Sequence, residues 1–281
     1  MNINQFQMKN LATYKNEICL IAGSGLFVYE VANFLNNKNL LNQVILINQN
    51  SLIKKNFKNK CKSFEIKDIE KITKFIKSKK LKKIMIIGYV DFPSIDKINL
   101  SIKSKLLISK DIFLNNINDQ SKILKKYLSN NKLTLLSQKK ILKKMLVSYQ
   151  DEYIHNENKK IISKLKIKKS FLKKIFSMNI AQSFILNGDR VLAMEDIFGT
   201  NDMINKIGKI STKFNDLIFV KSKKSNQIDE IDFPIIGMET LKLLIKYKFR
   251  VICLFNNNIL ISEKDNFLKK IRSNNISLII L

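Results

Sequence analysis

The chain has 281 residues, 45% of them hydrophobic, and its 51 Lys and Arg against 23 Asp and Glu give a formal net charge of +28 at pH 7. This hydrophobic fraction is typical of globular proteins and the length predicts about two domains, so disorder of the whole chain is excluded. Only seven glycines and two prolines are present, which excludes collagen-like and Pro/Gly-rich architectures.

The positive charge comes from 48 lysines and only three arginines. Proteins that bind nucleic acid usually use arginine, because the guanidinium group contacts guanine and phosphate through two hydrogen bonds at once. The lysines are also spread along most of the sequence, whereas a binding tract would concentrate them. We therefore expect no nucleic-acid partner, although the net charge predicts a general attraction to anionic lipids and nucleotides.

The three cysteines, Cys19, Cys61 and Cys253, lie far apart and predict neither a disulfide framework nor a zinc site. Residues 1–16 lack the pattern of a secretion signal. The longest uncharged apolar run, residues 84–90, is far shorter than the roughly 18 residues of a membrane-spanning helix. These features favour a cytoplasmic protein.

The first half of the chain alternates predicted strands and helices. A buried strand over residues 18–22 is followed by the turn Gly23-Ser24-Gly25 and by an apolar-periodic helix over residues 26–35. Further strands are predicted at residues 43–47, 63–66, 83–88 and 133–136, and further helices at 68–76, 95–115 and 119–128. The alternation predicts an α/β fold with a parallel sheet, which we assign to an N-terminal domain over residues 1–150.

The second half begins after a polar stretch without periodicity, and we expect a linker at residues 151–160 followed by a C-terminal α/β domain over residues 161–281. A lysine-rich helix to about residue 178 comes first, and its Phe171, Ile175 and Met178 are expected in the core. The other predicted elements are a hairpin of residues 183–186 and 191–194, helices from 202 and over 239–247, and strands at 217–220, 250–255, 258–262 and 276–281.

The turn Gly23-Ser24-Gly25 is the first candidate site. Small residues let backbone N–H groups approach a phosphate, and the N-terminus of the following helix favours negative charge. A complete dinucleotide-binding motif would have a third glycine where Val28 stands. A plain tight turn between strand and helix therefore stays open beside phosphate binding.

Carboxylates at strand ends and in loops are the second candidate. Glu195 ends a predicted strand, and Asp232 directly precedes Phe233-Pro234. A carboxylate before a proline lies on an extended backbone, which suits the binding of Mg²⁺ or the positioning of a water molecule. Solvated loop charges are the alternative. His155 is the only histidine and lies in the polar stretch, so a triad with an imidazole base has no good candidate.

Four segments together resemble one enzyme family. They are residues 20–25, residues 87–93, residues 187–200 and, most specifically, Ile231-Asp232-Phe233-Pro234-Ile235-Ile236-Gly237. In their order and spacing these segments resemble the LpxI type of UDP-2,3-diacylglucosamine diphosphatase, an enzyme of lipid A biosynthesis, in a divergent form. The altered positions include Phe92, Phe198 and Asn201. They leave open the alternative of a catalytically inert homologue that binds a nucleotide sugar or lipid.

The resemblance implies a Rossmann-like N-terminal domain, a C-terminal α/β catalytic domain and a cleft between them. It implies hydrolysis of the diphosphate of UDP-2,3-diacylglucosamine to UMP and 2,3-diacylglucosamine 1-phosphate (lipid X), with Mg²⁺ or another divalent cation. Asp232 matches the essential carboxylate, and Asp232 and Glu195 would bind the metal. The residues expected to bind substrate are Gly23, Ser24, Gly25, Gly199, Thr200, Lys221, Gln227 and Thr240. Peripheral contact with the inner membrane surface and a homodimer are left open.

Overall fold

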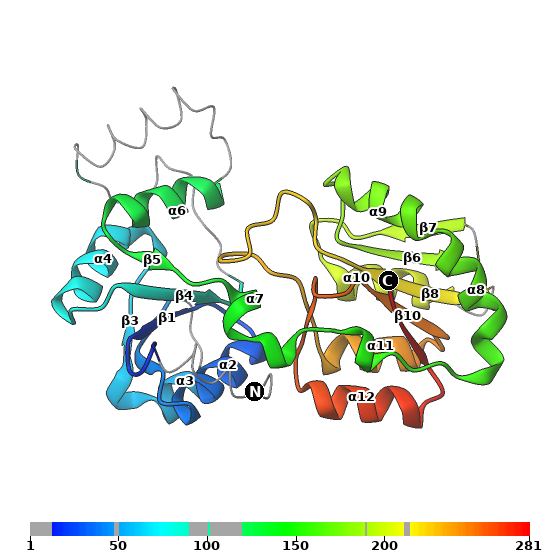
Figure 1. Ribbon diagram of the computed structural model, residues 1–281, viewed down its shortest axis with the longest axis horizontal. Helices are drawn as coiled ribbons and strands as arrows, with labels where there is room; N and C mark the ends of the chain where they lie inside the picture. The colour runs from blue at the N-terminus through cyan, green and yellow to red at the C-terminus, as the bar shows by residue number, and fades with distance from the viewer. Residues whose placement is uncertain (1–12, 48–50, 90–100, 102–119, 189, 211–213) are drawn as a thin grey trace. The chain divides into compact units, whose positions relative to one another are not determined.

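The structure is a computed structural model (Figure 1) that describes residues 13–47, 51–89, 101, 120–188, 190–210 and 214–281. Its contacts divide the chain into two compact units. Unit 1 holds the residues up to 141 together with 228–232, and unit 2 holds residues 142–227 and 233–281. Both units combine helices with a sheet. The prediction of an α/β fold with two domains is therefore confirmed.

Unit 1 is built on a five-stranded parallel sheet in the order β3-β2-β1-β4-β5. The strands are β1 (Ile18–Ala22), β2 (Leu41–Leu46), β3 (Cys61–Ser63), β4 (Lys83–Ile87) and β5 (Thr134–Leu135). Since β2 and β3 lie on one side of β1 while β4 and β5 lie on the other, the direction in which strands are added reverses between β1 and β4. Ligands of parallel α/β sheets bind preferentially at such a reversal.

Helices cover both faces of this sheet. They are α2 (Leu26–Asn37), α3 (Ser51–Asn56), α4 (Ile69–Ser78), α6 (Gln120–Asn130), the short α7 (Gln138–Ile141), and the 3₁₀ turns η1 (Lys58–Lys60) and η2 (Ile66–Asp68). Ile76 of α4 and Leu128 of α6 pack against Cys19, Ile45 and Ile86 of the strands. Alternate strand residues point to the other face, where α2 contacts β2 and β4. The predicted helix over 95–115 lies outside the described residues, apart from Ser101.

Unit 2 contains a mixed five-stranded sheet in the order β12-β10-β8-β6-β7. Strands β8 (Leu217–Lys221), β10 (Val251–Leu254) and β12 (Ser277–Ile280) are parallel to one another, and β6 (Ser183–Asn187) is antiparallel to both β8 and β7 (Arg190–Met194). A separate parallel pair consists of β9 (Ile235–Ile236) and β11 (Leu260–Ile261). The predicted hairpin of β6 and β7 is confirmed.

The sheet of unit 2 lies between two helical layers (Figure 1). Helices α8 (Lys159–Ile167) and α9 (Lys169–Ser177) cover one face, and α10 (Thr200–Gly208), α11 (Met238–Lys246) and α12 (Lys264–Ser273) cover the other. The alternation of side chains along each strand explains both layers. Phe184 and Val220 contact the α8–α9 side, whereas Ile185 and Phe219 contact the α10–α12 side.

The predicted linker at residues 151–160 is instead packed on unit 2. The N–H of Tyr153 donates to the carbonyl of Leu278 at 2.9 Å, and the Asp151 carboxylate lies 2.7 Å from the Lys264 ammonium. The buried amide of Asn158 donates to the carbonyl of Arg250 at 3.0 Å. Two polar residues of this stretch, Asp151 and Asn158, are therefore buried within a folded unit, and the contacts place the boundary at residue 141.

Three further expectations are corrected. The lysine-rich helix is two helices, α8 and α9, joined at Lys168. Phe171 and Met178 of the expected core stripe are 55% and 60% exposed, and only Ile175 packs against the core. Helix α12 and strand β9 were not predicted, although the buried pair Phe267 and Ile271 has helical spacing. Among the described residues, no helix is long and apolar enough to cross a membrane.

Candidate functional site

In unit 1, the turn that was predicted to bind phosphate lies at the reversal of strand order. Gly23 to Gly25 follow β1, and Gly88 and Tyr89 follow the neighbouring β4. The N–H of Ser24 donates to the Tyr89 carbonyl at 3.0 Å, and the N–H of Tyr89 donates to the Ser24 carbonyl at 3.2 Å. The two turns are thus joined by backbone hydrogen bonds at the carboxyl ends of β1 and β4.

Glycine suits positions 88 and 25 of these turns for different physical reasons. Gly88 has φ +88°, and a Cβ there would lie 2.4 Å from the Cγ2 of Val28 and 2.6 Å from the carbonyl oxygen of Ser24. Gly25 has φ +112° and precedes α2, but a Cβ there would meet nothing within 4 Å. Gly88 therefore permits close packing, whereas Gly25 supplies a left-handed backbone next to open space. Both a tight turn and a phosphate-binding turn agree with this geometry.

The segment that carries Asp232 is attached to unit 1 through Gln138. The backbone N–H of Gln138 donates to the Asp229 carbonyl at 3.0 Å, and its buried side-chain amide donates to the carbonyls of Ile86 at 2.9 Å and Ile231 at 3.2 Å. Ile231 packs against the core of unit 1. Asp232, at the end of this segment, is exposed. The anchor places residues 228–232 beside β4, the strand that leads into Gly88.

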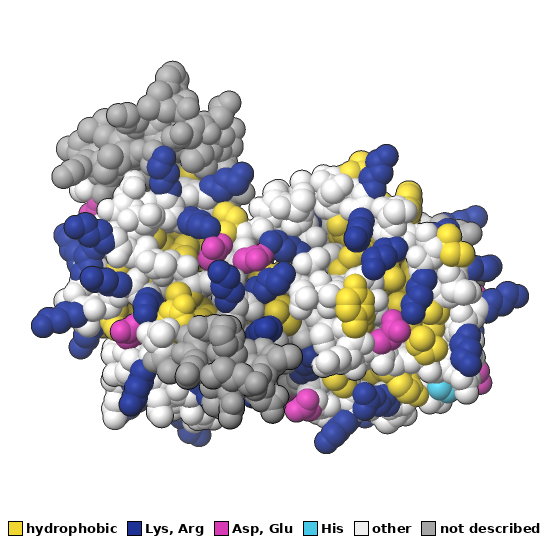
Figure 2. Space-filling model, viewed as in Figure 1, with side chains coloured by type: hydrophobic (Ala, Val, Ile, Leu, Met, Phe, Trp, Pro, Cys, Tyr) yellow, Lys and Arg dark blue, Asp and Glu magenta, His cyan; other side chains and the backbone are white. Residues whose placement is uncertain are grey.

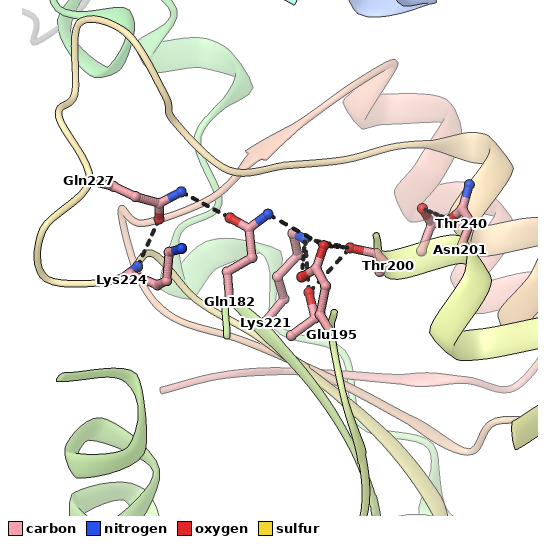
Figure 3. Close-up of polar contacts among 9 residues, drawn as sticks. Gln182, Glu195, Thr200, Asn201, Lys221, Lys224, Gln227 and Thr240 are labelled. Carbon is pink, nitrogen blue, oxygen red and sulfur yellow. Dashed lines mark hydrogen bonds and ion pairs between the residues drawn. The ribbon is translucent and has the colours of Figure 1, made fainter. Parts of the chain in front are cut away.

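In unit 2, three polar residues come together because of strand register. Lys221 is the last residue of β8 and pairs with Ser183, the first residue of the antiparallel β6. Glu195 directly follows β7, and its N–H donates to the Ser183 carbonyl at 3.0 Å. The three side chains therefore lie at one edge of the sheet, where Figure 3 shows Glu195 and Lys221 close together. We call Glu195, Lys221, Ser183 and Thr200 the polar cluster.

The cluster holds a buried ammonium group. The Nζ of Lys221 donates to the Oγ of Ser183 and to the Oγ1 of Thr200, both at 2.9 Å, and lies 3.8 Å from the Oε2 of Glu195. The hydroxyl of Thr200 in turn donates to the Oε1 of Glu195 at 2.8 Å. The side chains of Lys221 and Glu195 are only 3% and 11% exposed. Each charge therefore depends on the other for compensation.

One oxygen of the cluster is left without a hydrogen bond. The Oε2 of Glu195 is buried, and among the described atoms no group donates a hydrogen bond to it. A buried polar atom of this kind costs free energy, and a catalytic role is one of the reasons for which proteins retain it. The Oε2 of Glu195 therefore has the capacity to accept one further hydrogen bond.

Thr200 is the first residue of α10, so the N-terminus of a helix belongs to this edge. Gly199 precedes it with φ +89°, and no side chain caps the helix. The turn before it is fixed by the Asp196 carboxylate, which accepts from the N–H of Phe198 at 2.9 Å. That hydrogen bond and the Lys206 ammonium hold the pKa of Asp196 below its ordinary value. An uncapped helix N-terminus beside a lysine is suited to an anion such as phosphate.

Glutamine, asparagine and threonine side chains extend the polar cluster on two sides (Figure 3). The amide of Gln227 donates to the Oε1 of Gln182 at 3.0 Å, and Gln182 reaches the Oε1 of Glu195 at 3.5 Å. On the other side, the hydroxyl of Thr240 donates to the Oδ1 of Asn201 at 2.7 Å. Five of the predicted substrate residues thus lie along this edge of unit 2, namely Gly199, Thr200, Lys221, Gln227 and Thr240.

Four residues of these sites were not predicted: Gln138, Gln182, Ser183 and Asn201. Ser183 could have been predicted from the sequence, because it is a polar residue at the start of an otherwise apolar strand. In an antiparallel pair, the first residue of one strand lies beside the last residue of the other. Asn201 directly follows the predicted Thr200. The role of Gln138 depends on a segment 93 residues away in the sequence, and local patterns carry no information about it.

The predicted metal-dependent function needs correction. The Glu195 carboxylate already contacts the Thr200 hydroxyl and the Lys221 ammonium. In the described part of the chain, no group of three or more His, Cys, Asp or Glu side chains could hold a metal ion. The described residues therefore show no metal site that would support metal-dependent hydrolysis, and the assignment of Asp232 and Glu195 as metal ligands stays a prediction. Participation of Mg²⁺ or another divalent cation stays a prediction that these residues do not test.

Each half of the chain matches a protein-family model. Residues 17–145 match the LpxI N-terminal domain, and residues 150–279 match the LpxI C-terminal domain. A search of curated proteins found no match. Both matched domains belong to LpxI, the enzyme family that the four sequence segments resemble.

The LpxI family consists of UDP-2,3-diacylglucosamine pyrophosphatases, hydrolases of a diphosphate bond that act in lipid A biosynthesis. The two matched domains together span nearly the whole sequence, from residue 17 to residue 279. The chain therefore belongs to the LpxI family.

Proposed function

We propose that the polar cluster of unit 2 binds the diphosphate of UDP-2,3-diacylglucosamine. The observation that carries this proposal is the buried ammonium of Lys221, which two hydroxyl groups hold at the N-terminus of α10. A preorganised cation and an uncapped helix N-terminus stabilise the negative charge that develops on phosphate oxygens during hydrolysis. Gln227 and Thr240, at the two ends of the edge, would contact the rest of the substrate.

Asp232 is our candidate for the carboxylate that activates water. It is exposed at the end of segment 228–232, and the next residues, Phe233 and Pro234, are buried. A carboxylate in this setting can orient a water molecule and accept its proton. The water oxygen forms a bond to one phosphorus atom, and the bond from that phosphorus to the bridging oxygen breaks. The products are UMP and 2,3-diacylglucosamine 1-phosphate, with the bridging oxygen kept by the leaving phosphate.

The turn from Gly23 to Gly25 is proposed to contact the uridine nucleotide. The strand order of unit 1 supports a Rossmann-like fold, in which nucleotides bind where the strand order reverses. Gly25 faces open space at that point. A homodimer and a cytoplasmic location are further predictions from the sequence, and the geometry adds no argument for either.

The test is the release of UMP from UDP-2,3-diacylglucosamine by purified protein. We expect Asp232→Asn to reduce the rate at least about a hundredfold, and thermal unfolding checks that the variant remains folded. Glu230→Gln is the matched control, since Glu230 lies in the same segment and pairs with Lys125 on the surface. Equal rates for Asp232→Asn and the wild type would remove the proposed role of Asp232, and no UMP release by the wild type would favour an inert homologue.

A further inference from the structure

An exposed apolar stripe runs along α9. Phe171, Ile175 and Met178 are spaced by four and three residues, so they lie on one face of the helix. Phe171 is 55% exposed and Met178 is 60% exposed, while Ile175 is partly buried. Ile167, at the end of α8, and Ile180, just after α9, are 81% and 56% exposed. Four large exposed apolar side chains thus fall within residues 167–180, and exposed apolar patches are typical of interaction sites.

Packing of unit 2 explains Ile175, which contacts the core, but not the exposed Phe171 and Met178. Helix α9 is anchored on the sheet by a different pair, Leu172 and Phe176, which are both buried. Helix α12, on the opposite face of the same sheet, provides a comparison. It is anchored in the same way by Phe267 and Ile271, but the exposed positions Lys269 and Lys270 on its outer side are charged. Anchoring a helix on this sheet thus does not require exposed apolar residues.

The stripe lies within a segment that is strongly basic. Residues 159–180 contain eight lysines and no acidic residue. The Lys166 ammonium forms an ion pair with the Glu152 carboxylate at 3.3 Å. Figure 2 shows hydrophobic and basic side chains interleaved over the part of unit 2 that carries α8 and α9. Lys174 falls on the same helix face as Phe171 and Met178, because it is three residues from one and four from the other.

We propose that the α8–α9 surface, formed by Ile167, Phe171, Met178, Ile180 and the surrounding lysines, docks on an anionic lipid bilayer. Apolar side chains of an interfacial helix enter the boundary between headgroups and acyl chains, and lysines are attracted to anionic headgroups. The charge of the segment is complementary to such a surface. A nucleic acid would engage the lysines but would leave the apolar stripe without a role. This surface is distinct from the polar cluster, so the proposal does not rest on the proposed catalytic residues.

Vesicle flotation with the full chain tests the proposal. The probes are vesicles of phosphatidylethanolamine with phosphatidylglycerol, vesicles of phosphatidylcholine alone, and a single-stranded oligonucleotide. We expect the wild type to float with the anionic vesicles. Phe171→Ser/Met178→Ser and, separately, Lys173→Glu/Lys174→Glu should each lower the apparent affinity about tenfold or more. Lys269→Glu/Lys270→Glu on α12 makes the same change of net charge and should retain most of the binding.

These variants replace exposed side chains, and thermal unfolding checks that each remains folded. The proposal is overturned if the wild type does not float, or if the two α9 variants bind vesicles as the wild type does. It is also overturned if the α12 variant loses as much binding as the lysine variant of α9, because net charge alone would then explain flotation. Loss of oligonucleotide binding in the α9 variants, with vesicle binding intact, would replace the bilayer by a nucleic-acid partner.

Discussion

The two units present different chemistry at the carboxyl ends of their parallel strands. In unit 1 that edge is made of backbone: Ser24 and Tyr89 exchange hydrogen bonds, and Gly25 supplies a left-handed conformation next to open space. In unit 2 the edge is made of side chains, with the buried ammonium of Lys221 facing Glu195. The backbone hydrogen bonds and turns of unit 1 require glycines, which have no side chain. The buried side chains of unit 2 require that each charge is compensated by the other. Different substitutions should therefore destabilise the two edges.

The largest effect on stability is expected from Lys221→Met. This change leaves the buried carboxylate of Glu195 without its cation, and breaking a buried ion pair costs about 3 kcal/mol. Adding Glu195→Gln removes the uncompensated charge and should recover most of that loss. The free energy of unfolding in urea measures both variants. Equal stability of Lys221→Met and the wild type would show that the pair does not hold this edge.

Cysteine labelling can assign such a loss to one unit. Cys19 lies in β1 of unit 1 and Cys253 in β10 of unit 2, and both are buried. Burial raises the pKa of Cys19 to about 12 and also raises the pKa of Cys253, so both thiols resist labelling until their unit opens. In a Cys61→Ser background, Lys221→Met should accelerate labelling of Cys253 and leave that of Cys19 unchanged. Faster labelling of both would mean that the units do not open separately.

In unit 1, two glycine substitutions should differ in their effect. Gly88→Ala adds a Cβ that clashes with Val28 and the Ser24 carbonyl at φ +88°, and overpacking with backbone strain costs about 3 kcal/mol. Gly25→Ala meets no neighbour, so only the strain of its backbone, with φ +112° and ψ 153°, remains, about 2 kcal/mol. Chemical denaturation compares the two variants. A larger loss for Gly25→Ala than for Gly88→Ala would contradict the assigned roles.

The sequence predicted the strand–turn–helix of unit 1 well because that signal is local. The apolar run at residues 18–22 and the glycine turn stand side by side in the chain, and β1 has those bounds. The polar cluster was predicted only as separate residues, since its geometry comes from the pairing of β6 with β8. Phe171 and Met178 were placed in the core because helical periodicity does not distinguish a buried face from an exposed one. The polar residues 151–160 were mistaken for a linker for a related reason: composition does not show that Asp151 and Asn158 are buried.

The smallest effect concerns the turn that leads into Thr200, and it depends on pH. The pKa of Asp196 is lowered by the N–H of Phe198 and by Lys206. Its ionised form therefore stabilises the folded state fully above the unfolded-state pKa, and this contribution is lost as the pH falls through the lowered folded-state pKa. Over that acidic range, the urea midpoint of the wild type should fall slightly more than that of Asp196→Asn. Identical pH profiles would show that this turn adds nothing to stability.

The most direct test of the central claim is the rate of UMP release from UDP-2,3-diacylglucosamine by the double variant Lys221→Met/Glu195→Gln, with slow labelling of Cys253 as evidence that unit 2 is folded. If the polar cluster binds the diphosphate, this folded variant should release UMP at least about a hundredfold more slowly than the wild type. A rate close to that of the wild type would contradict the assignment of this edge of unit 2 as the substrate site.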